Sequence, residues 1–216
     1  YTKVIAQTAM PVILMAITTS AISVIDTSLI RTGLLRAGLS DGEARYLYGA
    51  YSGYAMTVLN LPAGLLATLG VSIIPAISGA VAIGNSERVK KLTRNGVGIC
   101  CICGLLASAS VAVFGDLMLE ILFQNTASSL MLKMASPSIF FICMMQLSGS
   151  VLQAMGYTGR VFISSLVVGI IKLLSAIFLI STPEINIYGA AIGSDVAFMT
   201  GMIMNFIFLS RTSIKH

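Results

Sequence analysis

The chain has 216 residues, of which 56% are hydrophobic and 10% are charged, and its formal net charge is +5. Soluble globular domains carry about 25% charged residues, and a disordered chain needs low hydrophobicity and high net charge. The composition, with a mean hydropathy of +0.94, therefore excludes a soluble enzyme, a disordered segment and a small disulfide scaffold, and it predicts an integral membrane protein.

Six apolar runs are long enough to cross a bilayer, because about 20 helical residues span a hydrocarbon core of about 30 Å. In chain order they cover residues 4–30, 46–69, 95–114, 130–155, 161–181 and 186–209. Short polar segments join them, and the most charged of these covers residues 82–94. The short alternating segments of a membrane β-barrel are not found. The sequence predicts an all-α, polytopic bundle of about six transmembrane helices, formed as a single unit over residues 1–216.

Proline and glycine mark places where these helices bend or approach each other. Each proline inside an apolar run removes a backbone hydrogen bond and favours a kink, as we expect for Pro11, Pro62 and Pro137. The second run continues past Pro75, or Pro75 ends the second helix. The GxxxG spacing, which permits close approach of two helices, occurs at Gly49 and Gly53 and again at Gly189 and Gly193.

The cysteines and the single histidine do not predict a metal site. Cys100, Cys101, Cys103 and Cys143 all lie inside apolar runs, where we expect small hydrophobic residues and not a disulfide framework or zinc ligands. His216 is terminal and is expected to belong to a tail. The chain has no HExxH, GxSxG or Walker sequence and no acidic cluster for magnesium. The sequence therefore predicts neither an enzyme nor a cofactor.

The basic residues of the loops predict the orientation of the chain. With the N-terminus inside, eight basic residues fall in the inner segments: Lys3, Arg88, Lys90, Lys91, Arg94, Arg160, Arg211 and Lys215. Four fall outside: Arg31, Arg36, Arg45 and Lys133. The positive-inside rule then places both ends of this segment in the cytoplasm. We interpret the positive net charge as a basic stripe beside anionic headgroups, or as a solvated loop with no lipid role, and not as a nucleic-acid site.

Two ionisable residues lie midway along predicted spans, Lys172 in the fifth and Asp195 in the sixth. At a rise of about 1.5 Å per residue, each lies roughly 13 Å from the outer end of its span. Because pairing reduces the cost of a charge in the membrane, we expect Lys172 and Asp195 to form a pair or to line a shared polar cavity. They would either couple a cation or proton to substrate movement or clamp the two helices together.

Asp26 and Arg31 lie near the outer end of the first span. Their spacing of five residues is not ideal for pairing on one helix. Asp26 is a candidate cation ligand and Arg31 a candidate phosphate ligand. The alternative is an interfacial pair that anchors the end of the helix.

Neutral polar side chains extend the set of candidate residues into other spans. Asn60 lies in the second span, and Gln146, Ser150 and Gln153 lie in the fourth at spacings that put them on one helix face. That face is expected to meet either a polar cavity or a neighbouring helix through hydrogen bonds. Asn60, Gln146 and Gln153 are therefore candidate substrate- or ion-binding residues.

Several segments also carry a resemblance to a known family. They are the acid near the end of a span (Asp26), AGLS (37–40), YG (48–49), NLP (60–62), VSIIPAIS (71–78), ERVKKLTR (87–94), SPSIFF (136–141), QAMG (153–156), IKL (171–173) and YGAAIG (188–193). In this order and spacing they resemble the second half of the MurJ-like and stage V sporulation protein B-like branch of the multidrug/oligosaccharidyl-lipid/polysaccharide exporter superfamily.

The resemblance implies two bundles of six helices around a central cavity, of which this chain supplies the second. The chain begins with Tyr1 and not with Met, so we expect it to be a fragment that lacks the first bundle. Such relatives move isoprenoid-diphosphate-linked sugars across the plasma membrane, some coupled to Na⁺ or H⁺ or to the membrane potential. Arginines in the family's cavity are taken to bind the diphosphate, and Arg31 and Arg36 are the nearest candidates here.

Two other functions remain open at this point. The first is a drug or cation antiporter of the same superfamily, although the lack of tryptophan and the aromatic content of 7% disfavour an aromatic cage for an organic cation. The second is a membrane scaffold that transports nothing, which the expected absence of the first bundle keeps open.

Overall fold

The computed structural model describes the backbone of residues 2–212, and their side chains except those of residues 2–9, 11 and 12. The predicted orientation used Lys3 and Lys215, and their side chains, like those of Pro11 and His216, lie outside this described part. The helical elements are α1 (Thr2–Arg36), α2 (Asp41–Gly49), η1 (Ala50–Ala55, a π-helical segment), α3 (Met56–Ala82), α4 (Ser86–Phe123), α5 (Ser129–Ala135), α6 (Pro137–Ala154), α7 (Thr158–Phe178) and α8 (Tyr188–Thr212).

Six helical segments of the described chain are long and apolar enough to cross a membrane. They are Ile13–Arg36, Asp41–Ala82, Ser86–Phe123, Pro137–Ala154, Thr158–Phe178 and Tyr188–Thr212. Large apolar side chains stand on their outer surfaces, including Leu65 (73% exposed), Val24 (72%) and Ile121 (71%). Such surface is stable in lipid and not in water. The all-α class and the six predicted spans are confirmed.

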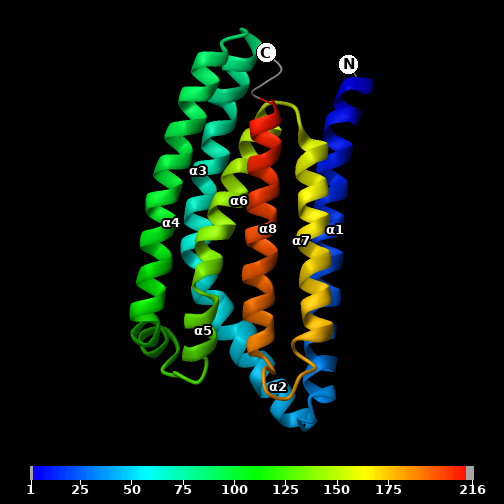
Figure 1. Ribbon diagram of the computed structural model, residues 1–216, viewed down its shortest axis with the longest axis vertical. Helices are drawn as coiled ribbons and strands as arrows, with labels where there is room; N and C mark the ends of the chain where they lie inside the picture. Colours follow the sequence, from blue (N-terminus) through cyan, green and yellow to red (C-terminus); the bar gives the residue numbers. More distant parts are fainter. Residues whose placement is uncertain (1, 213–216) are drawn as a thin grey trace.

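The spans lie side by side in the spatial order α4, α3, α6, α8, α7, α1 (Figure 1). Helix α6 packs against α3, α4 and α8 and has half of its span buried, whereas α1 packs mainly on α7 and has 6% of its span buried. The short helices α2 and α5 lie at one end of the molecule, and the α3–α4 turn lies at the other (Figure 1). Helix α1 is therefore an edge helix, and α6 is the centre of the packing.

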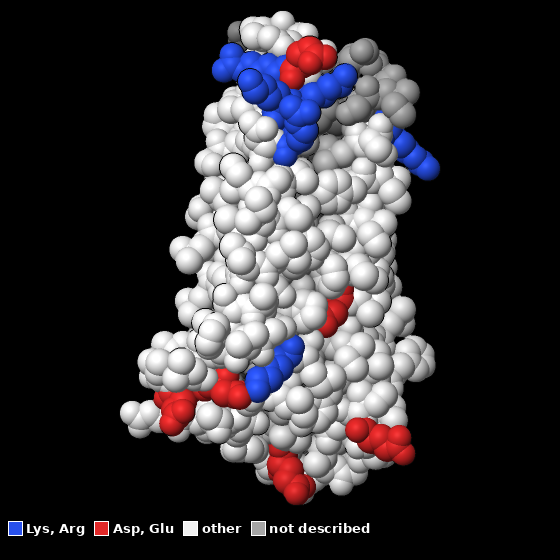
Figure 2. Space-filling model, turned by 60° about the vertical axis from the view of Figure 1, so that its left-hand side comes forward, with Lys and Arg blue, Asp and Glu red and all other residues white. Residues whose placement is uncertain are grey.

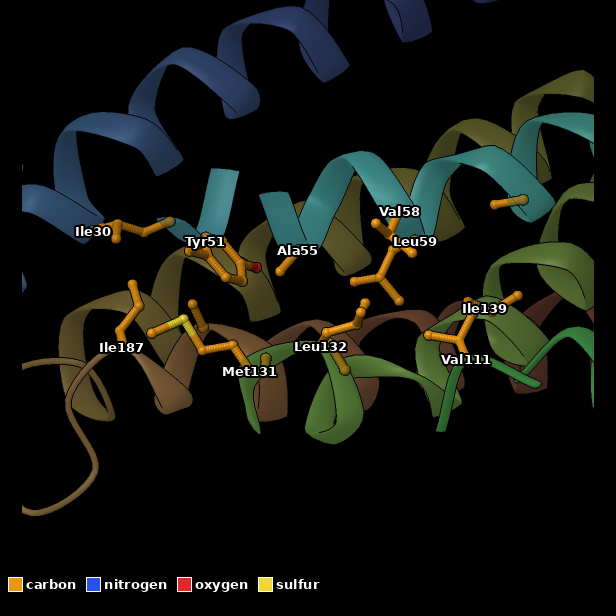
Figure 3. Close-up of a cluster of buried hydrophobic side chains, with 14 of the residues drawn as sticks. Ile30, Tyr51, Ala55, Val58, Leu59, Val111, Met131, Leu132, Ile139 and Ile187 are labelled. Carbon is orange, nitrogen blue, oxygen red and sulfur yellow. The ribbon is translucent and has the colours of Figure 1, made fainter. Parts of the chain in front are cut away.

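The main apolar core joins elements from the whole chain toward the α2 and α5 end. Figure 3 shows Tyr51 of η1, Leu59 of α3, Leu132 of α5 and Ile139 of α6 within one cluster. Apolar side chains gain little from leaving lipid for protein, so close packing stabilises such a core more than hydrophobicity does. The short helix α5 fills the space between α4 and α8.

Two predicted helix boundaries are wrong, and the alternative that Pro75 ends the second helix is excluded. Helix α4 begins at Ser86, within the segment predicted as a polar loop, because the Asn85 side chain accepts a hydrogen bond from the Arg88 amide and caps it. Helix α3 continues through Pro75 to Ala82, and it ends where Gly84 adopts a φ of +68° that favours glycine. The fourth run is divided by a break at Ser136 into α5 and α6.

The glycine pairs behave differently from each other. A Cβ atom on Gly193 would overlap the Ser175 hydroxyl of α7, and one on Gly189 would lie 2.8 Å from the Leu179 Cβ. Glycine at both positions therefore permits the close approach of α7 and α8, as the spacing predicts. A Cβ on Gly49 or Gly53 would meet no atom of the described chain within 4 Å, so this second pair does not mediate helix packing within it.

Candidate functional site

Helices α1 and α7 carry a partly buried ion pair within their spans. The Lys172 Nζ lies 3.1 Å from an Asp26 carboxylate oxygen, and the two side chains are 21% and 15% exposed. The prediction that Lys172 pairs with Asp195 is therefore wrong. Depth along a helix follows from residue number, but the direction of a side chain around the axis depends on which helix packs beside it, and α1 packs along α7.

Hydroxyl and apolar side chains lie beside this ion pair. A small cavity lined by Asp26 and Lys172 is also lined by Tyr51, Ser175 and Ser194. The Lys172 Nζ also lies 5.9 Å from the centre of the Phe198 ring, so a weak cation–π contact adds to the pair. We call Asp26, Lys172, Tyr51, Ser175 and Ser194 the α1–α7 polar cluster.

Tyr51 reaches the cluster from the π-helical segment and is 3% exposed. A π-helical turn has an extra residue compared with an α-helical turn, which changes the direction of the side chains that follow. The Ser52 hydroxyl donates to the Tyr48 carbonyl at 2.8 Å within the same segment. Tyr51 was not identified as a candidate residue from the sequence. The only sequence feature that could have pointed to it is a tyrosine within a glycine-containing stretch.

Asp195 has a partner on α6 and not on α7. The Ser138 hydroxyl donates to the Asp195 carboxylate, and Ser138 is 3% exposed. This contact joins the first turn of α6 to the second turn of α8. The sequence marked Ser138 only as part of the SPSIFF segment, so its role as a hydrogen-bond donor to an acid was missed.

Three charged side chains form a second cluster where α1 ends and α2 begins. Arg31 and Arg45 bind opposite oxygens of Asp41 at 2.7 and 2.6 Å. Ser40 caps α2, and its side chain and the Glu43 side chain form a capping box that fixes the first turn on which Asp41 lies. The alternative that Arg31 pairs with Asp26 is wrong, and the sequence missed both Asp41 and Arg45.

The remaining candidate residues lie apart from these clusters. Arg36 is the last residue of α1 and is exposed, as are Asn60 on α3 and Gln146 on α6. Gln153 is half-buried. Ser150, on the same α6 face as the glutamines, packs against α3, where a Cβ on Gly70 would lie 2.9 Å from its hydroxyl oxygen. That face is thus partly packed and partly open.

Helix α3 exposes small and polar side chains along one line. Residues three or four apart share a helix face, and this line consists of Gly53 in η1 and of Thr57, Asn60, Gly64 and Thr68 on α3, all exposed. The Thr57 hydroxyl donates to the Gly53 carbonyl at 2.7 Å, and a Cβ on Gly64 would meet no atom of the described residues within 4 Å. We call this line the α3 polar stripe.

Charge is separated along the long axis of the molecule. Figure 2 shows lysines and arginines gathered at the end that carries the α3–α4 turn, across a wide uncharged belt from most of the acidic side chains in view. Near the acidic end, Lys133 pairs with Asp116 at 2.6 Å. Among the described residues, no group of three or more histidine, cysteine or acidic side chains could hold a metal ion, and the cysteines are free.

Comparison with known proteins finds sequence similarity to a flippase family. The model of the family "Lipid II flippase MurJ" matches residues 2–130. Stage V sporulation protein B of Bacillus subtilis (strain 168) is 26% identical over 169 residues, which are 78% of this chain and 32% of that protein. The chain thus spans about a third of the length of this curated relative. No solved structure matches it.

Proposed function

We propose that this chain, which belongs to the MurJ family of lipid II flippases, is one helix bundle of a transporter. The transporter would move a lipid-linked saccharide precursor, of the peptidoglycan or polysaccharide type, across the plasma membrane. The six spans and the match to about a third of the length of a longer relative support this assignment. In this proposal, residues 1–216 form a single bundle, and an N-terminal bundle outside this sequence completes the transporter.

The observation that carries the proposal is polar surface left open within the spans. The α3 polar stripe and Gln146 are exposed at levels where a transmembrane helix otherwise meets lipid. Hydrocarbon offers no hydrogen-bond partners, so such groups favour a protein partner or a water-filled path. An isoprenoid-linked sugar needs such a path for its polar head while its apolar tail stays in lipid. Asn60, Gln146 and Gln153 are the proposed contacts along the path.

Arginines at the α1–α2 junction are the proposed diphosphate ligands. Arg31 and Arg45 share one acid, Asp41, so a single negative charge faces two guanidinium groups. Guanidinium groups bind phosphate oxygens in bidentate geometry, and a diphosphate would compete with Asp41 for Arg31. Arg36, exposed at the end of α1, is proposed as a further ligand.

Asp195 and the α1–α7 polar cluster are assigned to coupling. The Lys172–Asp26 pair holds α1 against α7 in this state, and a transport cycle that separates these helices would break it. Asp195, which accepts a hydrogen bond from Ser138, is the proposed site for a proton or Na⁺. If both Asp195→Asn and Lys172→Met transported normally at normal expression, the coupling role would be wrong.

The proposed orientation puts the α3–α4 turn in the cytoplasm. Among the described side chains, the basic residues of that end are Arg88, Lys90, Lys91, Arg94, Arg160 and Arg211, against Arg31, Arg36, Arg45 and Lys133 at the other. The positive-inside rule then favours cytoplasmic positions for both the start of α1 and the end of α8.

A flipping assay in proteoliposomes tests the function. The protein is reconstituted together with the protein segment encoded immediately upstream of Tyr1, and a fluorescent lipid-linked precursor and a fluorescent organic cation are compared. We expect the precursor, and not the cation, to be moved, and Asn60→Leu with Gln146→Leu to slow it at least tenfold. Preferential export of the cation would establish the antiporter. Movement of neither compound, in a well-folded sample, would favour the scaffold.

A further inference from the structure

Helix α4 is much longer than a bilayer requires. Its 38 residues extend about 57 Å at about 1.5 Å per residue, whereas the hydrocarbon core is about 30 Å thick. The first turns of α4 carry Arg88, Lys90, Lys91 and Arg94, all exposed, with Glu87 beside them. The start of the helix therefore stands in the headgroup region and presents a net positive surface there.

A cavity of about 460 Å³ opens beside this basic surface. It lies between the α3–α4 turn, the start of α4, the α6–α7 turn and the end of α8, and its apolar lining comes from Val81, Val89 and Met155. Asn85, Ser86, Lys90, Tyr157 and Thr212 give it a polar rim. Lys90 also lines a second hollow, of about 710 Å³, together with Arg88, Lys91 and Arg94. Apolar and cationic surfaces thus meet at Lys90.

One wall of the cavity is held in place by Arg160. Its guanidinium lies 4.6 Å from the centre of the Tyr157 ring and donates to the Phe208 carbonyl at 3.3 Å. Arg160 therefore fixes the Tyr157 ring and the end of α8 relative to each other. It already has these partners, so among the described side chains the cation available to a ligand at this cavity is Lys90, with Lys91 and Arg88 next to it.

We propose that this cavity binds an anionic glycerophospholipid of the membrane leaflet at the basic end of the molecule. The phosphate would lie beside Lys90 at the start of α4, where the lysine favours an anionic headgroup. The upper part of an acyl chain would lie on Val81, Val89 and Met155. A soluble acidic protein would need the basic residues but not the apolar lining, so the pairing of the two favours a lipid.

This site is separate from the proposed transport path. The α3 polar stripe ends at Thr68, more than three helical turns before Val81, and the α1–α7 polar cluster lies toward the opposite end of the molecule. The inference rests on membrane insertion of the chain and on neither the proposed substrate nor the proposed orientation, because anionic headgroups bind at whichever surface carries this end.

Native mass spectrometry of the purified protein tests the site with two probes, phosphatidylglycerol and phosphatidylcholine. We expect phosphatidylglycerol to be retained in preference, and Lys90→Gln to weaken its binding about fivefold, the effect of one lysine near an anionic surface. Lys133→Gln removes the same charge at the other end and should leave binding unchanged. Val81→Trp fills the cavity without changing charge and should also reduce retention.

Three results would overturn the site. The first is equal retention of both lipids by the unmodified protein. The second is an equal effect of Lys90→Gln and Lys133→Gln. The third is unchanged retention in Val81→Trp. Circular dichroism and gel filtration establish that each variant is folded. A protein that flips the precursor without preferring phosphatidylglycerol would contradict this inference alone.

Discussion

A charged side chain inside the hydrocarbon region is costly unless it has a partner, and Lys172 has one in Asp26. The pair joins an edge helix, α1, to α7, while Asp195 takes its hydrogen bond from Ser138 on α6. Asp26 and Asp195 therefore have different partners, and we expect different consequences when they are changed. Removing the lysine leaves Asp26 as a partly buried carboxylate without its cation.

Lys172→Met should lower the free energy of unfolding by on the order of 1–3 kcal/mol, less than for a fully buried pair because both side chains keep some exposure. Lys172→Met combined with Asp26→Leu should recover part of the loss, since no unpaired charge remains. Thermal unfolding in detergent measures each variant. Asp195→Asn is the matched control, and its effect should add to that of Lys172→Met. Coupling of Lys172 to Asp195 and not to Asp26 would contradict the pairing.

At the scale of the helix, contacts between small residues decide which spans approach closely. Gly189 and Gly193 let α8 lie against α7, whereas Gly64 stands in open space on α3. In lipid, this close packing replaces much of the driving force that hydrophobic burial supplies in water. We therefore expect that a larger residue is tolerated at Gly64 on α3 but not at Gly189 or Gly193 on α8.

Gly193→Ala should destabilise the protein by about 1–3 kcal/mol, because the new methyl group would overlap the Ser175 side chain. Gly64→Ala should be neutral or stabilising by up to about 1 kcal/mol, since alanine favours the helix and meets no atom of the described chain. Thermal unfolding of the two variants side by side makes the comparison. Equal losses would mean that α7 and α8 are not packed as closely as described.

At the scale of the whole molecule, the ends differ in charge and in shape. Basic side chains gather around the α3–α4 turn (Figure 2), and the α1–α2 junction and α5 form the opposite end (Figure 1). The start of α1 and the end of α8 lie at the basic end, as an even number of spans requires. This separation is the basis of the proposed orientation.

Single cysteines test the orientation. Glu87→Cys at the start of α4 and Glu184→Cys in the turn between α7 and α8 both replace exposed side chains. In intact cells, a membrane-impermeant maleimide should label Glu184→Cys at once and Glu87→Cys only after permeabilisation. The unmodified chain, whose cysteines lie within spans, gives the background. The reverse labelling pattern would mean that the protein is inserted in the opposite orientation, and it would contradict the positive-inside assignment.

The sequence by itself determined the helical class, the number of spans and the gathering of basic residues at one end. These properties depend on local hydropathy and on loop charge, which are read along the chain. Pairing between helices was not determined. Residue number gives the depth of Lys172, but each residue also turns about 100° around the helix axis, so packing selects Asp26 over Asp195 as its partner.

The tertiary structure alone decided which residues complete each cluster. Asp41 lies ten residues beyond Arg31 and reaches it only because a tight turn and a capped α2 bring it back. Tyr51 lies in the α1–α7 polar cluster because it belongs to a π-helical segment. The hydrophobic periodicity of the sequence does not predict such a segment. Contacts of this kind depend on three-dimensional placement of whole helices, whereas the spans themselves follow from the cost of exposing peptide groups and charges to hydrocarbon.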